Sequence, residues 1–355
     1  MTAVLLARPD AAPGGDMLQL QETAAVLQGA GHQVVITDAK GAAEALSSGD
    51  VLHLWNVQRA WDWQELPERA REVGARVFVT PLLHPTERYH RSGRRGVDAV
   101  AARVVRDAER FRGLRRGKGS AKERASAVLL EADAVLLAHE REAELLRAWS
   151  GVEVRGTVVP PAIPEVVAEA VPDLPGVGPL PDDFALCVGR IEPLKNPLGV
   201  LTAAQQLRLP IVFVGAMPRG RHLLHGRRFR AQCRGTARWV GPLDASAVRA
   251  LMQRARVHVL GSWTEVLGRV SVEAALEGCA VVATDVGHMP AYLGRDTPGL
   301  FLAEPGDGAA LVSALGRAWR FGRRPDGALA QRARGLLWDQ VGPRLLEVYG
   351  EPRIR

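Results

Sequence analysis

The 355-residue sequence has only three cysteines and no apolar run of the roughly 20 residues that a membrane-spanning helix requires. Cys187, Cys233 and Cys279 lie far apart without metal-ligand spacing, so we expect unpaired thiols in a reducing, cytoplasmic setting. Residues 1–8 lack the basic start and the cleavage site of a signal peptide. They are therefore predicted to form a buried strand.

Aromatic residues make up only 5% of the chain and are nearly absent from its most basic segment. Residues 88–124 contain thirteen Lys or Arg against four Asp or Glu, yet Phe111 is the only aromatic residue between Arg91 and Arg124. Readers of single-stranded nucleic acid interleave aromatic residues with their cations, so this composition argues against nucleic acid. A second basic segment, residues 219–238, contains no acid. Both segments either attract anionic partners or form solvated surface.

Short apolar strands alternate with amphipathic helices in both halves of the chain. This alternation predicts parallel sheets with right-handed crossovers, hence an α/β fold. The predicted strands are residues 3–7, 34–37, 51–55, 77–80, 134–138, 156–159, 184–188, 211–214, 239–240, 257–260, 280–284 and 299–302. A Gly14-Gly15 turn follows the first strand and precedes a helix predicted at about residues 17–28.

Seven prolines between Pro160 and Pro181 interrupt this alternation and predict a linker. We therefore predict an N-terminal domain over residues 1–160, a proline-rich hinge over 161–181 and a C-terminal domain over 182–325. A helical segment over 326–355 is expected to pack back on the N-terminal domain. Two doubly wound domains place ligands beyond the carboxyl ends of their strands.

Two cations follow the predicted strand 184–188 on one loop. Gly189-Arg190 begins this loop, and Lys195 lies five residues after Arg190. A planar guanidinium and a mobile ammonium at a sheet's carboxyl edge can reach the two phosphates of a diphosphate. Gly189 lets the backbone approach a ligand closely. The alternative is a surface turn with two incidental charges.

Two carboxylates flank the start of a helix predicted near Leu267. Glu265 lies in the preceding loop, and Glu273 lies about 12 Å further along the helix axis. This separation is too long for one acid–base pair, so we expect them to hold different hydroxyls of one elongated ligand. The helix N-terminus between them is suited to phosphate. An exposed helix carboxylate is the alternative for Glu273.

Together these segments resemble the retaining GT-B glycosyltransferases of family 4, or glycosyl transferases group 1, which share a G-R-x4-K loop and an E-x7-E motif. Further similar segments are Val281–Gly287, Gly306–Gly308 and, more loosely, Gly14-Gly15, Gly29–His32 and Val158–Pro161. The resemblance implies two doubly wound, Rossmann-like domains facing a cleft, the N-terminal one on the acceptor side and the C-terminal one binding a nucleotide-sugar.

The resemblance also implies residue roles. Arg190 and Lys195 would bind the donor diphosphate, and Glu273 would bind the ribose. Glu265 would hold hydroxyls of the transferred sugar. The remaining donor-binding residues implied are Gly14, Gly15, Gly189, Leu267, Gly268 and Arg269.

Two histidines receive different predictions. His84 is similar in position to a histidine that the family uses against the donor sugar, so it joins Glu265, Arg190 and Lys195 in the implied catalytic set. Its alternative role is to cap a strand end. His139 is expected to be structural.

Five residues depart from the family's usual pattern, and two of them border the expected sugar pocket. These are Arg269 and His288, and the other departures are Val266, Ala280 and Ala291. They leave the diphosphate ligands in place. The reaction class is therefore predicted, but the identity of the sugar is not.

The predicted activity is retaining transfer of a sugar from a UDP- or GDP-sugar to a hydroxyl of a glycan or lipid-linked acceptor. The segments that carry the motifs contain neither an Asp-x-Asp pair nor a His/Cys cluster, so we predict no metal and no cofactor. No side chain is placed as a covalent nucleophile, and the resemblance implies a front-face mechanism assisted by the leaving phosphate. The cation clusters predict an anionic acceptor or a peripheral contact with the inner face of the membrane.

Two alternatives remain open. One is a non-catalytic protein that binds a nucleotide-sugar. The other is an epimerase or phosphorylase on the same fold, although a phosphorylase would need a lysine-anchored pyridoxal cofactor and a longer chain.

Overall fold

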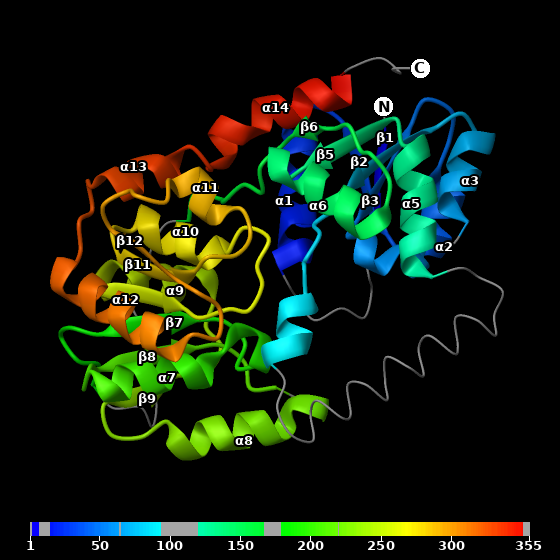
Figure 1. Ribbon diagram of the computed structural model, residues 1–355. Coiled ribbons are helices and arrows are strands. Elements are labelled where there is room, and N and C mark those ends of the chain that lie inside the picture. The colour runs from blue at the N-terminus through cyan, green and yellow to red at the C-terminus, as the bar shows by residue number, and fades with distance from the viewer. Residues whose placement is uncertain are drawn as a thin grey trace. The chain divides into compact units, whose positions relative to one another are not determined.

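The computed structural model describes residues 2–6, 15–63, 65–93, 120–166, 179–218 and 220–350. The chain forms two compact units, each built on a six-stranded parallel sheet (Figure 1). The N-terminal unit comprises residues 1–84, 100–164 and 338–355, and the C-terminal unit comprises residues 85–99 and 165–337. Within the described residues, the chain passes between the units at residues 84, 164 and 337, whereas the predicted boundaries were 161–181 and 326.

The sheet of the N-terminal unit has the order β2-β1-β3-β4-β5-β6. Its strands are β1 (Thr2–Leu6), β2 (Gln33–Thr37), β3 (Val51–Trp55), β4 (Arg76–Thr80), β5 (Ala134–Leu137) and β6 (Thr157–Val158). Ala3, Val4 and Leu5 of β1 are fully buried because neighbouring strands and both helical layers cover them. This explains why the central strands read as continuous apolar runs.

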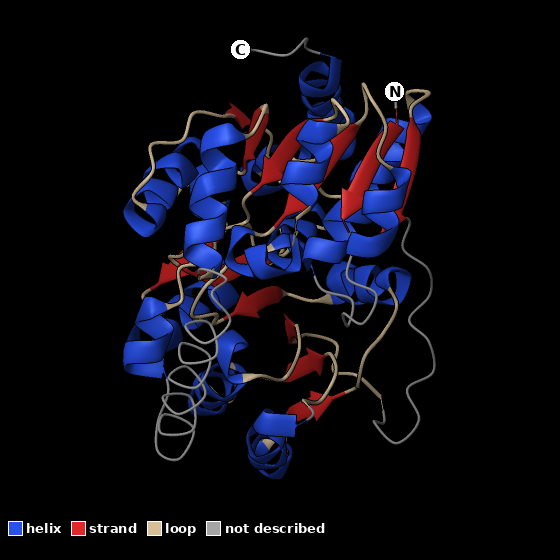
Figure 2. Cartoon of the chain, turned by 90° about the vertical axis from the view of Figure 1, so that its right-hand side faces the viewer, coloured by secondary structure: helices blue, strands red, loops and turns tan. Residues whose placement is uncertain are grey.

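Helices cover both faces of this sheet (Figure 2). They are α1 (Gly15–Gly29), α2 (Ala39–Ala45), α3 (Leu66–Glu72), α5 (Ala121–Glu131), α6 (Glu140–Ser150), α14 (Trp338–Gly350) and the 3-10 helix η1 (Val57–Trp63). Leu20 of α1 and Leu345 of α14 share one core with Leu5, while Leu146 of α6 and Trp63 lie in the core on the other face. A capping box of Ser120 and Glu123 starts α5.

The sheet of the C-terminal unit has the order β12-β11-β10-β7-β8-β9. Its strands are β7 (Ala185–Val188), β8 (Ile211–Val214), β9 (Ala237–Trp239), β10 (Val257–Leu260), β11 (Ala280–Thr284) and β12 (Leu300–Ala303). Its helices are α7 (Pro197–Gln206), α8 (Leu223–Gln232), α9 (Ala245–Arg254), α10 (Arg269–Leu276), α11 (Met289–Leu293), α12 (Gly308–Phe321) and α13 (Ala328–Arg334). Short helical turns are η2 (Tyr89–Gly93), η3 (Pro193–Lys195) and η4 (Gly220–His222).

The twelve predicted strands are all present, each with ends within two residues of the prediction where those residues are described. The α/β class and the two doubly wound sheets are therefore confirmed. Two predicted segments lie largely outside the described residues, namely the proline-rich linker and the basic segment 88–124. None of the described helices is long and apolar enough to cross a membrane.

The C-terminal helix α14 is fastened to the N-terminal unit by a buried polar network. The hydroxyl of Tyr349 lies 2.7 Å from Nδ1 of His53, and the hydroxyl of Thr80 lies 2.7 Å from Nε2 of the same ring. Burial lowers the pKa of His53 to about 3, so the ring is neutral and bonds through both nitrogens. The indole of Trp338 donates to Glu22 of α1 at 3.0 Å.

Candidate functional site

The two motif loops of the C-terminal unit meet where its strand order reverses. β7 connects to β8 on one side and pairs with β10 on the other, so the chain leaves the carboxyl ends of these two neighbours in opposite directions. Ligands of open α/β sheets bind at such a switch point. Gly189–Lys195 follows β7, and the loop containing Glu265 follows β10.

The loop after β7 holds both predicted diphosphate ligands. The amide of Gly189 donates to Val214 at 2.9 Å, which fixes the start of this loop to the end of β8. Arg190 is 56% exposed, and its Nε lies 2.6 Å from a carboxylate oxygen of Glu192. Lys195 ends a short 3-10 turn and is only 25% exposed. The two cations, both predicted to bind the diphosphate, thus differ in their surroundings.

Lys195 and Glu265 form an ion pair that joins the two motif loops. The ammonium Nζ lies 2.5 Å from Oε1 of Glu265, whose side chain is 13% exposed. The hydroxyl of Ser262 donates to the same oxygen at 2.7 Å. The amide of Trp263 also donates to the carbonyl of Leu194 at 2.8 Å. A residue assigned to the diphosphate and one assigned to the sugar are therefore in direct contact.

The helix α10 begins at Arg269, two residues after the predicted start. Gly268 precedes it with φ of 75°, a conformation that favours glycine. Leu267 is 2% exposed, while Arg269 and Glu273 are half-buried. The backbone carbonyl of Glu273 accepts from the guanidinium of Arg249 at 3.2 Å, which ties α10 to α9.

The loop after β11 packs tightly on the loop that carries Glu265. A Cβ atom at Gly287 would collide with the carbonyl oxygens of Glu265 and Val266, so glycine is required there. The next amide, that of His288, donates to the carbonyl of Val266 at 2.7 Å. His288 is 3% exposed, so this departure from the family pattern is a packed residue beside the site.

Residues 85–93 pack against the same part of the C-terminal unit. The rings of Tyr89 and Trp263 have centroids 6.1 Å apart, and Gly93 lies against both. Arg88 pairs with Glu304 at 2.7 Å, in the loop after β12. Two residues of the basic segment thus already have partners in the described part of the chain, where a solvated surface or an anionic ligand was expected.

In the N-terminal unit, His84 follows β4 at the carboxyl edge of the sheet. Its backbone N–H and C=O pair with the side chain of Gln58 at 3.1 and 2.9 Å. Gly15 is the first residue of α1, while Gly14 lies outside the described residues. The donor-binding roles of these three residues stay predictions.

Glu142 is a fully buried carboxylate that holds two loops at this edge. It accepts from the amide of Leu83 at 2.9 Å and from that of Ala138 at 2.6 Å. Burial raises the pKa of Glu142 to about 7, although the two amides act in the opposite direction. His139 accepts from the amide of Arg141 at 3.1 Å and caps α6, as its structural prediction implied.

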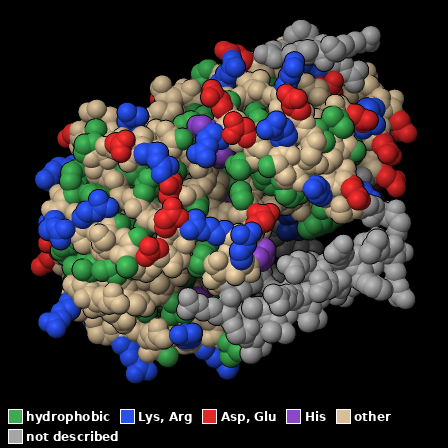
Figure 3. Space-filling model, viewed as in Figure 1, with side chains coloured by type: hydrophobic (Ala, Val, Ile, Leu, Met, Phe, Trp, Pro, Cys, Tyr) green, Lys and Arg blue, Asp and Glu red, His purple; other side chains and the backbone are tan. Residues whose placement is uncertain are grey.

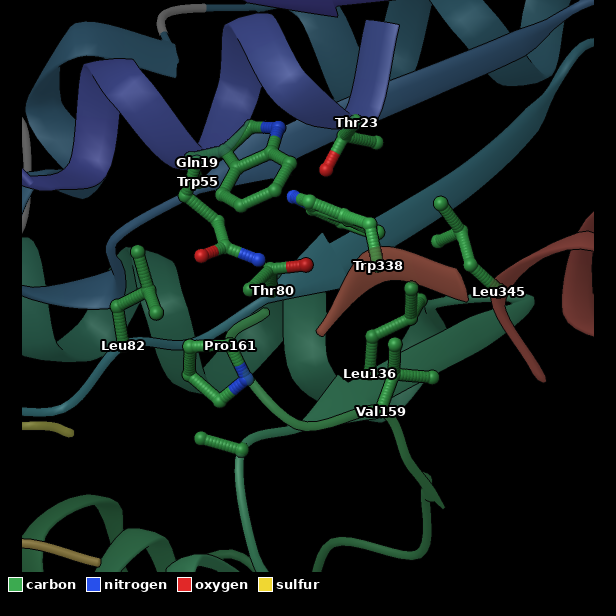
Figure 4. Close-up of a pocket in the computed structure, with 11 residues that line it drawn as sticks. Gln19, Thr23, Trp55, Thr80, Leu82, Leu136, Val159, Pro161, Trp338 and Leu345 are labelled. Carbon is green, nitrogen blue, oxygen red and sulfur yellow. The ribbon is translucent and has the colours of Figure 1, made fainter. Parts of the chain in front are cut away.

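Two hollows lie at the carboxyl edge of the N-terminal sheet. One is shown in Figure 4, where side chains of Gln19, Trp55, Thr80 and Trp338 gather from α1, β3, β4 and α14. Pro161 and Leu82 also line it. It is mainly apolar, with a few polar groups at one end.

The second hollow lies at the carboxyl ends of the neighbouring strands β1 and β3, beside Leu6 and Asn56. Three of the residues that line it have a buried polar atom without a hydrogen-bond partner among the described residues: Nε1 of Trp55, Oδ1 of Asn56 and Nε1 of Trp63. Buried polar groups without partners are rare in proteins. Two donors and one acceptor therefore lie on neighbouring residues at this edge of the sheet.

The sequence analysis missed Ser262, Trp263, Glu142 and this polar hollow. Ser262 and Trp263 could have been found, because they directly follow a buried strand at the predicted switch point. Glu142 gave no local signal, since it is one of several acids at the start of an amphipathic helix. Within the described ranges, no group of three or more His, Cys, Asp or Glu side chains could hold a metal ion.

Residues 183–320 match the family model described as Glycosyl transferases group 1. D-inositol 3-phosphate glycosyltransferase 2 of Catenulispora acidiphila is 34% identical over 154 residues, 38% of this chain and 36% of the relative. The D-inositol 3-phosphate glycosyltransferase of Actinosynnema mirum is 29% identical over 254 residues, 64% of this chain and 59% of the relative. The matched part thus spans between about a third and three fifths of these relatives. The predicted resemblance to glycosyl transferases group 1 is confirmed.

Solved structures share the fold over nearly the whole chain. Sucrose-phosphate synthase from Thermosynechococcus elongatus has a TM-score of 0.75 at 17% identity, covering 98% of both chains. Anabaena HepE in complex with UDP and glucose has a TM-score of 0.69 at 15% identity, also covering 98% of both chains. The fold is therefore that of GT-B glycosyltransferases.

Proposed function

We propose that this chain transfers a sugar from a nucleotide-diphosphate donor to an acceptor hydroxyl, with retention at the anomeric carbon and without a metal ion. The observation that carries the proposal is the contact between Lys195 and Glu265, which brings the G-R-x4-K loop and the E-x7-E segment together at the switch point. The ammonium of Lys195 can bind a phosphate of a diphospho-sugar, and the carboxylate of Glu265 can bind hydroxyls of the adjoining sugar.

Arg190 and Lys195 would neutralise the charge that develops on the leaving diphosphate. The start of α10 adds backbone N–H groups and the positive end of the helix dipole. Glu273 would hold the ribose, and Glu265 would hold hydroxyls of the sugar. With no side chain assigned as nucleophile, the acceptor would attack from the face that the diphosphate leaves, and the leaving phosphate would take the acceptor proton.

The donor is proposed to be a UDP-sugar, because HepE is a structural neighbour solved with UDP-glucose. GDP-sugars remain the second choice. A hydroxyl-bearing acceptor is proposed to bind the N-terminal unit at the carboxyl edge of its sheet, beside Trp55, Asn56 and Trp63. The relatives' name makes D-inositol 3-phosphate the first acceptor to test. A glycan or lipid-linked acceptor and a cytoplasmic location, peripheral at the inner membrane face, stay predictions.

The test is an activity screen with UDP-glucose and matching GDP- and ADP-sugars, each with D-inositol 3-phosphate or a neutral sugar alcohol. Mass spectrometry identifies the transfer product, and the anomeric proton coupling of that product reports retention. Donor binding without transfer to any acceptor would favour a non-catalytic binding protein. A donor sugar changed at one centre without transfer would favour an epimerase.

A further inference from the structure

The C-terminal unit contains a long stretch of the chain without an acidic residue. Between Glu192 and Asp244 there are nine Lys or Arg and no Asp or Glu. Four of these cations, Arg227, Arg228, Arg230 and Arg234, are exposed on α8 or just after it. Within the described ranges, none of the four has a carboxylate partner at ion-pair distance. Their charge is therefore not neutralised by a carboxylate of the described residues.

The packing of α8 decides which of its side chains face outward. Phe229 is fully buried and its ring meets that of Phe213 in β8 at 4.9 Å, edge to face. Gly226, one turn earlier, is buried against Pro218. Because residues three and four apart share a helix face, Leu223, Arg227 and Arg230 form one outward stripe. Leu224 and Arg228 form a second.

Leucines are exposed at the start of the same helix. Leu223 is 46% exposed and Leu224 is 69% exposed. They are the only large apolar side chains so exposed in the described part of the C-terminal unit. In Figure 3, blue and green side chains stand together at the lower edge of the molecule, where Figure 1 places α8. Exposed apolar residues beside unpaired arginines are a feature that aqueous solvation alone does not favour.

An open hollow borders this helix. It is lined by Arg230, Arg234 and Arg238 together with Trp239. The guanidinium of Arg230 lies 5.0 Å from the centre of the Trp239 ring, which holds it in place. Three guanidinium groups around one hollow suit a phosphate-bearing headgroup.

We propose that the outward face of α8, defined by Leu223, Leu224, Arg227, Arg228 and Arg230, docks on an anionic lipid bilayer. A cationic helix with exposed apolar residues binds at the headgroup boundary, where the leucines insert and the arginines meet anionic headgroups. A free phosphate would make no use of the leucines. Nucleic acid would need exposed stacking rings, but Phe229 is fully buried and the half-buried Trp239 already has the guanidinium of Arg230 over its ring.

This surface has a defined relation to the candidate donor site. A helix that follows a parallel strand starts at the sheet's carboxyl edge, so Leu223 and Leu224 stand at the edge that carries Lys195 and Glu265. Docking through α8 would bring that edge toward the membrane. The docking itself does not depend on the proposed transfer activity.

The test is co-sedimentation of the full chain with vesicles of phosphatidylglycerol and phosphatidylcholine, against pure phosphatidylcholine, at low and high salt. The parent chain is expected to bind the anionic vesicles at low salt and to be released at high salt. Replacing Arg227, Arg228 and Arg230 by Gln should lower the partition coefficient by about a hundredfold, since each cation near an anionic surface contributes about 1 kcal/mol. Replacing Leu223 and Leu224 by Gln should lower binding about tenfold or more, and this loss should persist at high salt.

Matched controls separate a docking face from overall charge. Gln at the exposed Arg254, Arg320 and Arg334 removes the same charge from other helices of the unit, and Leu130→Gln removes an exposed leucine elsewhere. These variants should bind vesicles like the parent. The proposal is overturned if the parent ignores anionic vesicles, if the control triple loses as much binding as the α8 triple, or if the leucine pair has no effect. Stronger binding to a single-stranded oligonucleotide than to vesicles would also overturn it. UDP affinity should be unchanged in all variants, which keeps this test separate from the donor site.

Discussion

The Lys195–Glu265 pair permits a prediction in which two adjacent substitutions have different effects on nucleotide binding. Lys195→Met removes the ammonium and keeps the length of the side chain. A hydrogen bond to a charged group contributes about 1.5–3 kcal/mol, so the dissociation constant for UDP should rise by about 10- to 150-fold. Glu265→Gln removes the carboxylate that holds Lys195 in the unliganded protein. UDP affinity should then be unchanged or slightly higher. Transfer should fall by about a hundredfold or more, because the sugar hydroxyls lose a charged hydrogen-bond acceptor and meet an amide N–H₂ donor instead.

The effects of the same two substitutions on the free energy of unfolding should not be additive. The exposed fractions of 25% for Lys195 and 13% for Glu265 place the pair between surface and buried ion pairs. Each single variant should therefore lower the free energy of unfolding by about 1–3 kcal/mol, and the double variant should lose less than the sum. Glu265 also keeps the Ser262 hydroxyl as a donor, which limits the cost of losing Lys195.

Isothermal titration with UDP, steady-state transfer kinetics and urea unfolding measure these three effects. Lys122→Met is the matched control, because Lys122 is an exposed lysine on α5 in the other unit. It should change neither UDP affinity nor stability beyond about 0.5 kcal/mol. If Glu265→Gln loses as much UDP affinity as Lys195→Met, the assignment of one residue to phosphate and the other to sugar is wrong.

Four further predictions follow from other parts of the molecule. Arg190→Gln should weaken UDP binding by about tenfold, which calorimetry measures. Because the side chain is mostly exposed, the free energy of unfolding, measured in urea, should change by less than about 0.5 kcal/mol. His258 is fully buried in β10, and neither of its ring nitrogens is hydrogen-bonded to the described residues. His258→Leu should therefore raise the free energy of unfolding by about 1–2 kcal/mol, and a variant less stable than the parent chain would contradict this expectation. Burial lowers the pKa of His258 to about 3, so the native state binds fewer protons than the unfolded state between about pH 3 and 6.5. The free energy of unfolding should therefore fall as the pH falls through that range, by up to about 1.4 kcal/mol per pH unit from this residue. The slope of unfolding free energy against pH should therefore be smaller in His258→Leu. Glu142→Gln places an amide N–H₂ against one of two backbone donors and should cost about 2–4 kcal/mol in urea unfolding, a loss that an exposed-acid control, Glu140→Gln, should not show. Transfer activity should survive excess EDTA, and its loss would contradict the metal-free proposal.

The fold was largely predictable because its signals are local. Strands such as 211–214, 257–260 and 280–284 are short apolar runs between turns and helical patterns, and the structure has the same bounds. Parallel sheets buried on both faces produce such runs directly. The boundaries of the units were less predictable, because residues 85–93 join the C-terminal unit through contacts of Arg88 and Tyr89 with side chains about two hundred positions away.

The motif spacing named Arg190, Lys195, Glu265 and Glu273, and both their membership of the site and their assigned roles are still predictions. The pairing of Lys195 with Glu265 could not be predicted from this spacing. That Lys195 contacts Glu265 depends on β7 lying beside β10, a pairing that joins strands about seventy residues apart. No local pattern encodes that neighbour relation.

The sequence by itself determined the two α/β sheets, the motif loops at strand ends and the acid-free basic stretch, because these depend on residue type and short-range periodicity. Only the tertiary structure decided which charges are neutralised and which are left unpaired. It joined Lys195 to Glu265, buried Glu142 between two loops, and turned Phe229 inward so that Leu223 and Arg227 face outward. The partner of a charged side chain, its burial and the direction in which it points depend on chain segments that folding brings together. They are therefore fixed by long-range packing and not by local sequence.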